Sequence, residues 1–205
     1  MKIAPSLPLV AVVGMLTLTG CSTTPPSDIT DGCSIFKEKS GWYSDALDVQ
    51  KEYGTPIHVQ LAIIKQESSF KYDAKPEREY LLGFIPWGRK SSAYGYAQVK
   101  DATWEWYQQK SGNTSADRDD FGDAVEFIGW YTSVTQRTLG VSKWDAYNQY
   151  LAYHEGHGGF KRKTYLKKPW LVKVARKVEA SAKQYASQLH HCEGDLDKGF
   201  WLWPF

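Results

Sequence analysis

The sequence has little net charge, few cysteines and no apolar run long enough to cross a membrane as a permanent helix. Its 205 residues carry 25 basic and 23 acidic side chains, a formal net charge of +2. Nothing in this balance indicates a nucleic acid or another general polyanion as partner. The uncharged stretch Leu7–Leu18 is too short to span a bilayer. We find no internal repeat and no long alternating β pattern, so helical periodicity is the main structural signal.

The first twenty residues have the layout of an export signal. Lys2 precedes the apolar stretch, and the sequence LTGC follows at residues 18–21. This sequence resembles a bacterial lipobox, in which the signal is cleaved before the cysteine and the thiol is alkylated by diacylglycerol. An ordinary cleaved signal that happens to end near Cys21 is the alternative. Because Ser22 follows, the resemblance implies an outer membrane lipoprotein of a Gram-negative cell, facing the periplasm and held to the membrane by its N-terminal lipid.

The remaining chain divides by composition, and its two other cysteines frame the folded part. We expect a signal peptide at residues 1–20, a lipidated flexible tether at 21–31, one domain at 32–192 and an aromatic tail at 193–205. Export leads to an oxidising compartment, where cysteines usually pair. With Cys21 lipidated, Cys33 and Cys192 are expected to form a disulfide, and two unpaired thiols are the alternative. The bond would close a loop of about 160 residues, for which the chain-entropy model gives about 4–5 kcal/mol as an upper figure.

Five helices are predicted from caps and from apolar spacing of three and four residues. The first is opened by Thr55 as N-cap and Pro56, and the third is stopped by Gly140. The approximate ranges are 55–68, 101–107 and beyond, 120–139, 142–154 and 169–189. Their lengths predict an all-α, mainly helical single domain.

Three segments have no place in this helical pattern. Residues 71–100 are too long for a simple connector, and their apolar run 80–87 is expected to pack on the core, with a binding groove or a membrane as the alternatives. The aromatic tail 200–205 is expected to be docked. Residues 161–177 hold eight cationic side chains and no acidic one. A solvated face is the plain interpretation, and a surface for anionic peptide stems or lipid head groups is the sharper one.

Glu67 is the strongest candidate for acid–base chemistry. On the first helix it falls between the directions of Ile63 and Ile64, on the apolar side. Desolvation there favours the protonated carboxyl, as a general acid near neutral pH requires. A carboxylate bonded to nearby backbone at a helix end would produce the same pattern.

Three motifs extend the signal beyond this residue. They are QESSF at 66–70, SAYGYAQ at 92–98 followed by DAT at 101–103, and AYHEG at 152–156. In order and spacing they resemble the motifs of lytic transglycosylases related to soluble lytic transglycosylase and goose-type lysozyme, over roughly residues 50–190. The resemblance implies a lysozyme-like α fold with a substrate cleft, and peptidoglycan glycan strands as substrate. No cofactor, metal or nucleic acid is implied, and an envelope assembly partner is left open.

The resemblance also implies roles for individual residues. Glu67 matches the catalytic acid, and Tyr153 matches the tyrosine whose hydroxyl bonds that carboxyl. The residues that match substrate-binding positions are Ser68, Gly95, Tyr96, Gln98 and His154. Two departures are visible, because the family usually has Leu-Met at Tyr96-Ala97 and asparagine at His154. A metal site built from His154, Glu155 and His157 is the alternative for the last motif, but it lacks a third His or Cys at recognised spacing.

A single acid implies a particular reaction. Glu67 would protonate the glycosidic oxygen of the MurNAc–GlcNAc β-1,4 bond and then accept the proton of the muramic acid C6 hydroxyl, which leaves a 1,6-anhydroMurNAc end. A hydrolase with two carboxyl groups needs a second one within about 5–10 Å, for which Asp101, Glu105 and Glu155 are the candidates. The alternatives are therefore a goose-type lysozyme-like hydrolase and a non-catalytic peptidoglycan-binding lipoprotein.

Overall fold

The computed structural model describes the backbone of residues 24–201. It describes their side chains except at Tyr80, Leu81, Pro86 and residues 197–201. Over this range the chain forms seven α-helices, one short 3-10 helix and one two-stranded sheet, which confirms the mainly helical fold class. The elements are α1 (Gly32–Glu38), α2 (Trp42–Tyr53), α3 (Ile57–Ser68), β1 (Arg78–Leu81), β2 (Ile85–Arg89), α4 (Asp101–Ser111), α5 (Phe121–Leu139), α6 (Ala146–Lys161), η1 (Thr164–Lys167) and α7 (Pro169–Trp201). None of these described helices is both long and apolar enough to cross a bilayer.

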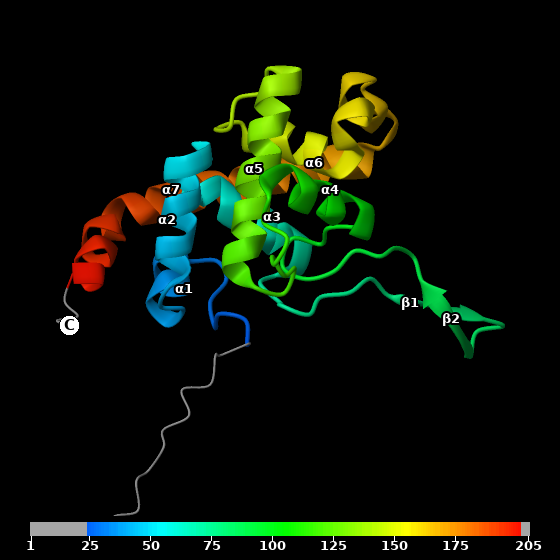
Figure 1. Ribbon diagram of the computed structural model, residues 1–205, viewed down its shortest axis with the longest axis horizontal. Helices are drawn as coiled ribbons and strands as arrows, with labels where there is room; N and C mark the ends of the chain where they lie inside the picture. The colour runs from blue at the N-terminus through cyan, green and yellow to red at the C-terminus, as the bar shows by residue number, and fades with distance from the viewer. Residues whose placement is uncertain (1–23, 202–205) are drawn as a thin grey trace, which may run out of the picture.

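Helix α5 is the centre of the fold (Figure 1). Every residue from Phe127 to Thr135 is buried, as expected for a helix that is surrounded by neighbours rather than lying on the surface. Gly129 makes the contact with α2 possible, since a Cβ there would lie 2.4 Å from a methyl carbon of Val49. Helix α7 packs against α1, α3 and α6. The helices thus pack around one continuous apolar core.

The predicted disulfide is confirmed. Cys33 on α1 and Cys192 on α7 are bonded, with their Cα atoms 6.1 Å apart. The bond joins the first helix of the described chain to the last.

Helix boundaries follow the caps, with two corrections. Asp120 and Gly140 bound α5 as predicted, but Thr55 does not cap α3. Its hydroxyl instead contacts that of Thr132 at 2.6 Å, and the Gln50 side chain accepts the Ile57 N–H. The helix expected from residue 142 begins at Ala146, because Asp145 is the residue whose side chain accepts from the helix N-terminus. Helices α1 and α2 were not predicted.

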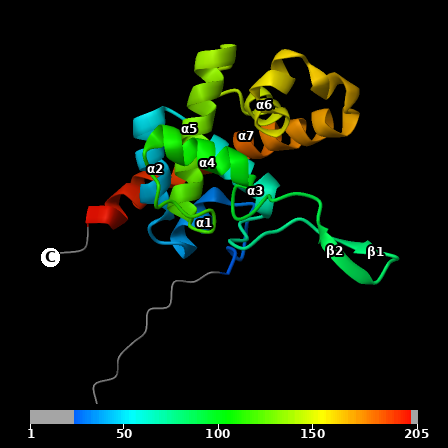
Figure 2. The same ribbon diagram turned by 45° about the vertical axis from the view of Figure 1, so that its right-hand side comes forward.

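The segment 71–100 is the largest departure from expectation. Its apolar run was predicted to pack on the core, and this prediction is wrong. The strands β1 and β2 pair antiparallel and form a hairpin that projects away from the helices in both views (Figures 1 and 2). Leu82, Phe84 and Trp87 are more than two-thirds exposed. Of the aromatic tail, residue 200 and Trp201 continue α7, and residues 202–205 lie outside the described range.

Candidate active site

A cavity of about 480 Å³ opens between the end of α3, the segment 91–100, and helices α4, α5 and α6. It brings together residues from all three sequence motifs. Its lining consists of Glu67, Pro76, Ser91, Ala93, Gln98, Val99, Lys100, Thr103, Phe127, Tyr131, Tyr153, His154, Glu155 and Gly156. Glu67, Gln98, Tyr153 and His154 are therefore neighbours around one cleft, although they lie far apart in sequence.

Glu67 occupies the penultimate position of α3 and lines the cleft. Helix α3 ends at Ser68, and both Ser69 and Phe70 after it adopt left-handed backbone, which turns the chain sharply after the carboxyl. Burial raises the pKa of Glu67 to about 7, against a smaller lowering by the hydrogen bond from the Tyr150 hydroxyl. A substantial fraction of this carboxyl is therefore protonated at neutral pH.

The tyrosine whose hydroxyl bonds the Glu67 carboxyl is Tyr150. The sequence predicted Tyr153 for this role, and that prediction is wrong. The single hydroxyl proton of Tyr153 is donated to the Ala97 carbonyl at 2.5 Å. Tyr153 still lines the cleft, and Glu67 contributes to raising its pKa well above the usual value, after burial itself. Tyr150 lies one turn earlier on α6, so it occupies the same side of the helix. The motif resemblance pointed to Tyr153, and Tyr150 lies outside all three motifs.

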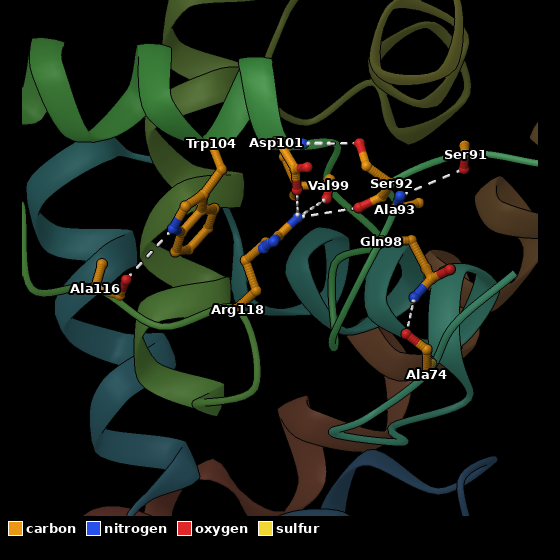
Figure 3. Close-up of polar contacts among 10 residues, drawn as sticks. All are labelled: Ala74, Ser91, Ser92, Ala93, Gln98, Val99, Asp101, Trp104, Ala116 and Arg118. Atoms are coloured by element: carbon orange, nitrogen blue, oxygen red, sulfur yellow. Dashed lines mark hydrogen bonds and ion pairs between the residues drawn. The ribbon is translucent and has the colours of Figure 1, made fainter. Parts of the chain in front are cut away.

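A clamp built on Arg118 holds the cleft segment 91–100 (Figure 3). Its guanidinium donates to the carbonyl oxygens of Ser92 and Val99, at 3.1 and 2.8 Å, and pairs with the Asp101 carboxylate at 2.8 Å. The Ser92 hydroxyl in turn accepts the Asp101 N–H. Arg118 was not predicted from the sequence, because no motif contains it. Its only signal is a lone arginine among the aspartates that precede α5.

Gly95 and Gln98 shape this segment in different ways. Gly95 is buried with φ +78°, and a Cβ there would lie 1.9 Å from the Arg118 carbonyl oxygen, so only glycine fits. Gln98 also has positive φ, and its amide nitrogen donates to the Ala74 carbonyl at 2.8 Å (Figure 3). It also donates to the Gly95 carbonyl at 3.0 Å. Strained backbone of this kind clusters at functional sites. Of the two residues, Gln98 lines the cleft and Gly95 supports it from behind.

Two other predicted contact residues do not reach the cleft. Ser68 is buried, and its hydroxyl donates to the Ile64 carbonyl one turn earlier. Tyr96 packs edge-on against the stacked rings of Trp42 and Phe121, with ring centroids 5.6 and 5.7 Å away, and its bulky ring is buried in the core. Both side chains are part of the packing that supports the site.

Glu155 is the second carboxyl of the cleft, and three neighbouring side chains bond its oxygens. Its side chain is 3% exposed and accepts from Lys168 Nζ at 2.7 Å, from the Thr164 hydroxyl and from His154 Nδ1 at 3.2 Å. Burial alone would raise its pKa, but these hydrogen bonds outweigh burial and lower it to about 2. Glu155 thus stays ionised and ties α6 to η1. Gly156 follows with non-helical backbone, which kinks α6 beside the cleft.

The two histidines of the third motif face different partners. His154 lines the cleft and meets the ring of Trp170 edge-on, while His157 contacts the Thr135 hydroxyl at 2.8 Å and stacks on Tyr131. Among the described residues, no three His, Cys, Asp or Glu side chains are grouped so that they could hold a metal ion.

A family model described as "Transglycosylase SLT domain" matches residues 9–192, nearly the whole chain. No curated protein matches the sequence. The matched range contains every residue of the cleft.

Proposed function

Because this chain belongs to the transglycosylase SLT domain family, whose members are lytic transglycosylases acting on peptidoglycan, we propose that Glu67 is its single catalytic acid and base. The proposed bond is the β-1,4 linkage between MurNAc and GlcNAc, and the proposed product end is 1,6-anhydroMurNAc.

The observation that carries this proposal is the pKa of Glu67, raised to about 7 at the wall of the cleft. A general acid works best when its pKa lies near the working pH, because it must hold its proton before the reaction and release it in the transition state. Among the described residues, Glu67 and Glu155 are the acidic side chains that line the cleft. Glu67 is the one with this property.

The reaction balances with one carboxyl. Glu67 gives its proton to the glycosidic oxygen as the bond from that oxygen to C1 of MurNAc breaks, and GlcNAc leaves with a free C4 hydroxyl. The C6 hydroxyl of the same MurNAc then bonds to C1. Its proton passes to the Glu67 carboxylate, which restores the enzyme without consuming water. The Tyr150 hydroxyl, as a donor, stabilises the carboxylate between the two steps.

The state of Glu155 favours this route over hydrolysis. A second catalytic carboxylate would have to act as nucleophile or activate a water molecule. Glu155 is already bonded to a lysine, a threonine and a histidine, and its lowered pKa makes it a poor base. We propose that Glu155 instead holds the His154 side chain in place. His154 is the residue that stands where the family usually has asparagine.

The cellular place of the enzyme is part of the same proposal. Cys21 lies outside the described residues, and the lipobox resemblance supports lipidation there, with the domain held at the periplasmic face of the outer membrane. Mass analysis of the mature N-terminus tests this. A diacylated Cys21 is the expected result, and a chain that begins at an unmodified residue contradicts it.

Digestion of purified peptidoglycan tests the role of Glu67. The Glu67→Gln variant should release almost no muropeptides while it still binds glycan, because the amide has a similar volume and cannot donate the required proton. Glu105→Gln is the matched control, since Glu105 is an exposed carboxylate of α4 outside the cleft lining. Substantial turnover by Glu67→Gln would contradict the assignment. A wild-type protein that binds peptidoglycan without cleaving it would favour the non-catalytic alternative.

A further inference from the structure

An exposed aromatic side chain stands at the rim of the cleft. Trp170, in the first turn of α7, is 55% exposed, and its ring meets that of the cleft residue His154 edge-on with centroids 5.2 Å apart. A half-exposed tryptophan beside a sugar cleft offers an apolar face to a pyranose ring. Trp170 therefore lies directly beside the cleft residue His154, in the first turn of α7.

The same face of α7 carries unneutralised positive charge. Lys173 and Lys177 follow Trp170 at three and seven residues, so the three side chains form one stripe along the helix. Both lysines are exposed. Of the eight cationic residues in 161–177, only Lys168 takes part in an ion pair within the described chain, and that ion pair is with Glu155.

The stripe ends at a second hollow of about 270 Å³ between α7 and α3. Lys177 and Ser181 line it from α7, and Lys65, Gln66 and Ser69 line it from α3. Lys65 lies over the Tyr185 ring and also attracts the Asp28 carboxylate. Lys177 has no such acidic partner among the described residues. The hollow thus offers cations and hydroxyls to an anionic ligand.

We propose that this stripe, from Trp170 through Lys173 to Lys177, binds the peptide stem carried by the MurNAc residue, with its free carboxylates on the two lysines. The inference rests on the proposed function, because it names the substrate form that the same cleft prefers. The lengths agree. Seven helical residues span about 10 Å, and a stem of four residues reaches at most about 14 Å when extended.

Two substrates separate this inference from the proposed function. One is intact peptidoglycan, and the other is the same material stripped of its stems by an amidase. Lys173→Glu combined with Lys177→Glu should lower kcat/KM roughly tenfold on intact material, because two exposed ion pairs are replaced by repulsion. It should leave kcat/KM on stripped glycan unchanged. The matched control exchanges the exposed lysines Lys51 and Lys110 for glutamate, with the same change of net charge, and should behave as wild type on both substrates.

The outcomes are distinct. An equal fall on both substrates, or no fall on intact material, overturns the stem site. A wild-type protein that makes no anhydro ends from either substrate overturns the proposed function instead. The stem site is then decided by binding of GlcNAc-MurNAc-tetrapeptide, which the lysine variant should bind roughly tenfold more weakly. A lysine variant that digests intact material normally but loses the preference of the full chain for phosphatidylglycerol over phosphatidylcholine vesicles would assign the stripe to lipid head groups.

Discussion

The carboxyl of Glu67 carries a stability cost that depends on pH. Its ordinary pKa is near 4.5 and the folded value is about 7. Between these values the folded protein retains a proton that the unfolded chain has released, so rising pH lowers the free energy of unfolding. The loss begins above the unfolded value and is complete above the folded one.

Glu67→Gln should therefore stabilise the protein in a pH-dependent way. The free energy of unfolding should rise by up to about 3 kcal/mol at about pH 8, and by little at about pH 4 where both states are protonated. Denaturant unfolding of the variant and the wild type across this range measures the difference. Curves that stay parallel from acid to alkaline pH would mean that Glu67 is not desolvated.

Tyr150 and Tyr153 make a matched pair of variants. The Tyr150 hydroxyl lowers the pKa of Glu67, so Tyr150→Phe should move the alkaline fall of kcat/KM to higher pH and reduce turnover, by roughly tenfold or more. Tyr153→Phe removes the bond to the Ala97 carbonyl instead, so it should leave that limb in place and cost about 1 kcal/mol of stability. A shifted limb in Tyr153→Phe alone would restore the motif tyrosine as the partner of the carboxyl.

The backbone conformation of the segment 91–100 requires glycine at position 95. Gly95 and Gly112 have nearly equal positive φ values, +78° and +82°, but only Gly95 faces a neighbour, the Arg118 carbonyl oxygen. Gly112→Ala should cost about 1–2 kcal/mol from the left-handed backbone alone. Gly95→Ala should cost clearly more and lower activity, because the clash displaces the wall of the cleft. Equal losses of thermal stability in the two variants would show that the contact with Arg118 is not rigid.

The elements that could be predicted from sequence are those with local signals. Helix α5 has an aspartate cap, a glycine stop and apolar spacing between them, and all three act within a few residues. The three motifs likewise placed Glu67, Gln98 and His154 at one cleft. These signals depend on spacing along the chain, which sequence records directly.

What could not be predicted depends on contacts between elements. Thr55 looked like a cap but bonds Thr132 from α5, and Tyr96 looked like a groove residue but fills the core against Trp42. The apolar hairpin tip around Phe84 has the composition of a buried segment and lies exposed. In each case the residue type allowed two environments, and only the tertiary packing decided between them.

At the scale of the whole molecule, one covalent bond joins the two ends of the domain. Replacing Cys33 and Cys192 by serine should lower the free energy of unfolding by about 2–5 kcal/mol, since the unfolded chain regains the freedom of a very long loop. Denaturant unfolding in oxidising buffer measures this. The cleft lies among α3 to α6, so activity at low temperature should persist. An unchanged midpoint would show that the bond adds nothing to stability.

The central claim is that the substrate's own hydroxyl, rather than water, attacks the sugar. Digestion of peptidoglycan in oxygen-18-labelled water, followed by mass analysis of the muropeptides, tests this most directly. The expected products are 1,6-anhydroMurNAc ends that carry no heavy oxygen and are one water lighter than reducing ends, and these products should disappear in Glu67→Gln. Reducing ends that carry the heavy isotope would show that the cleft activates water and that the protein is a hydrolase.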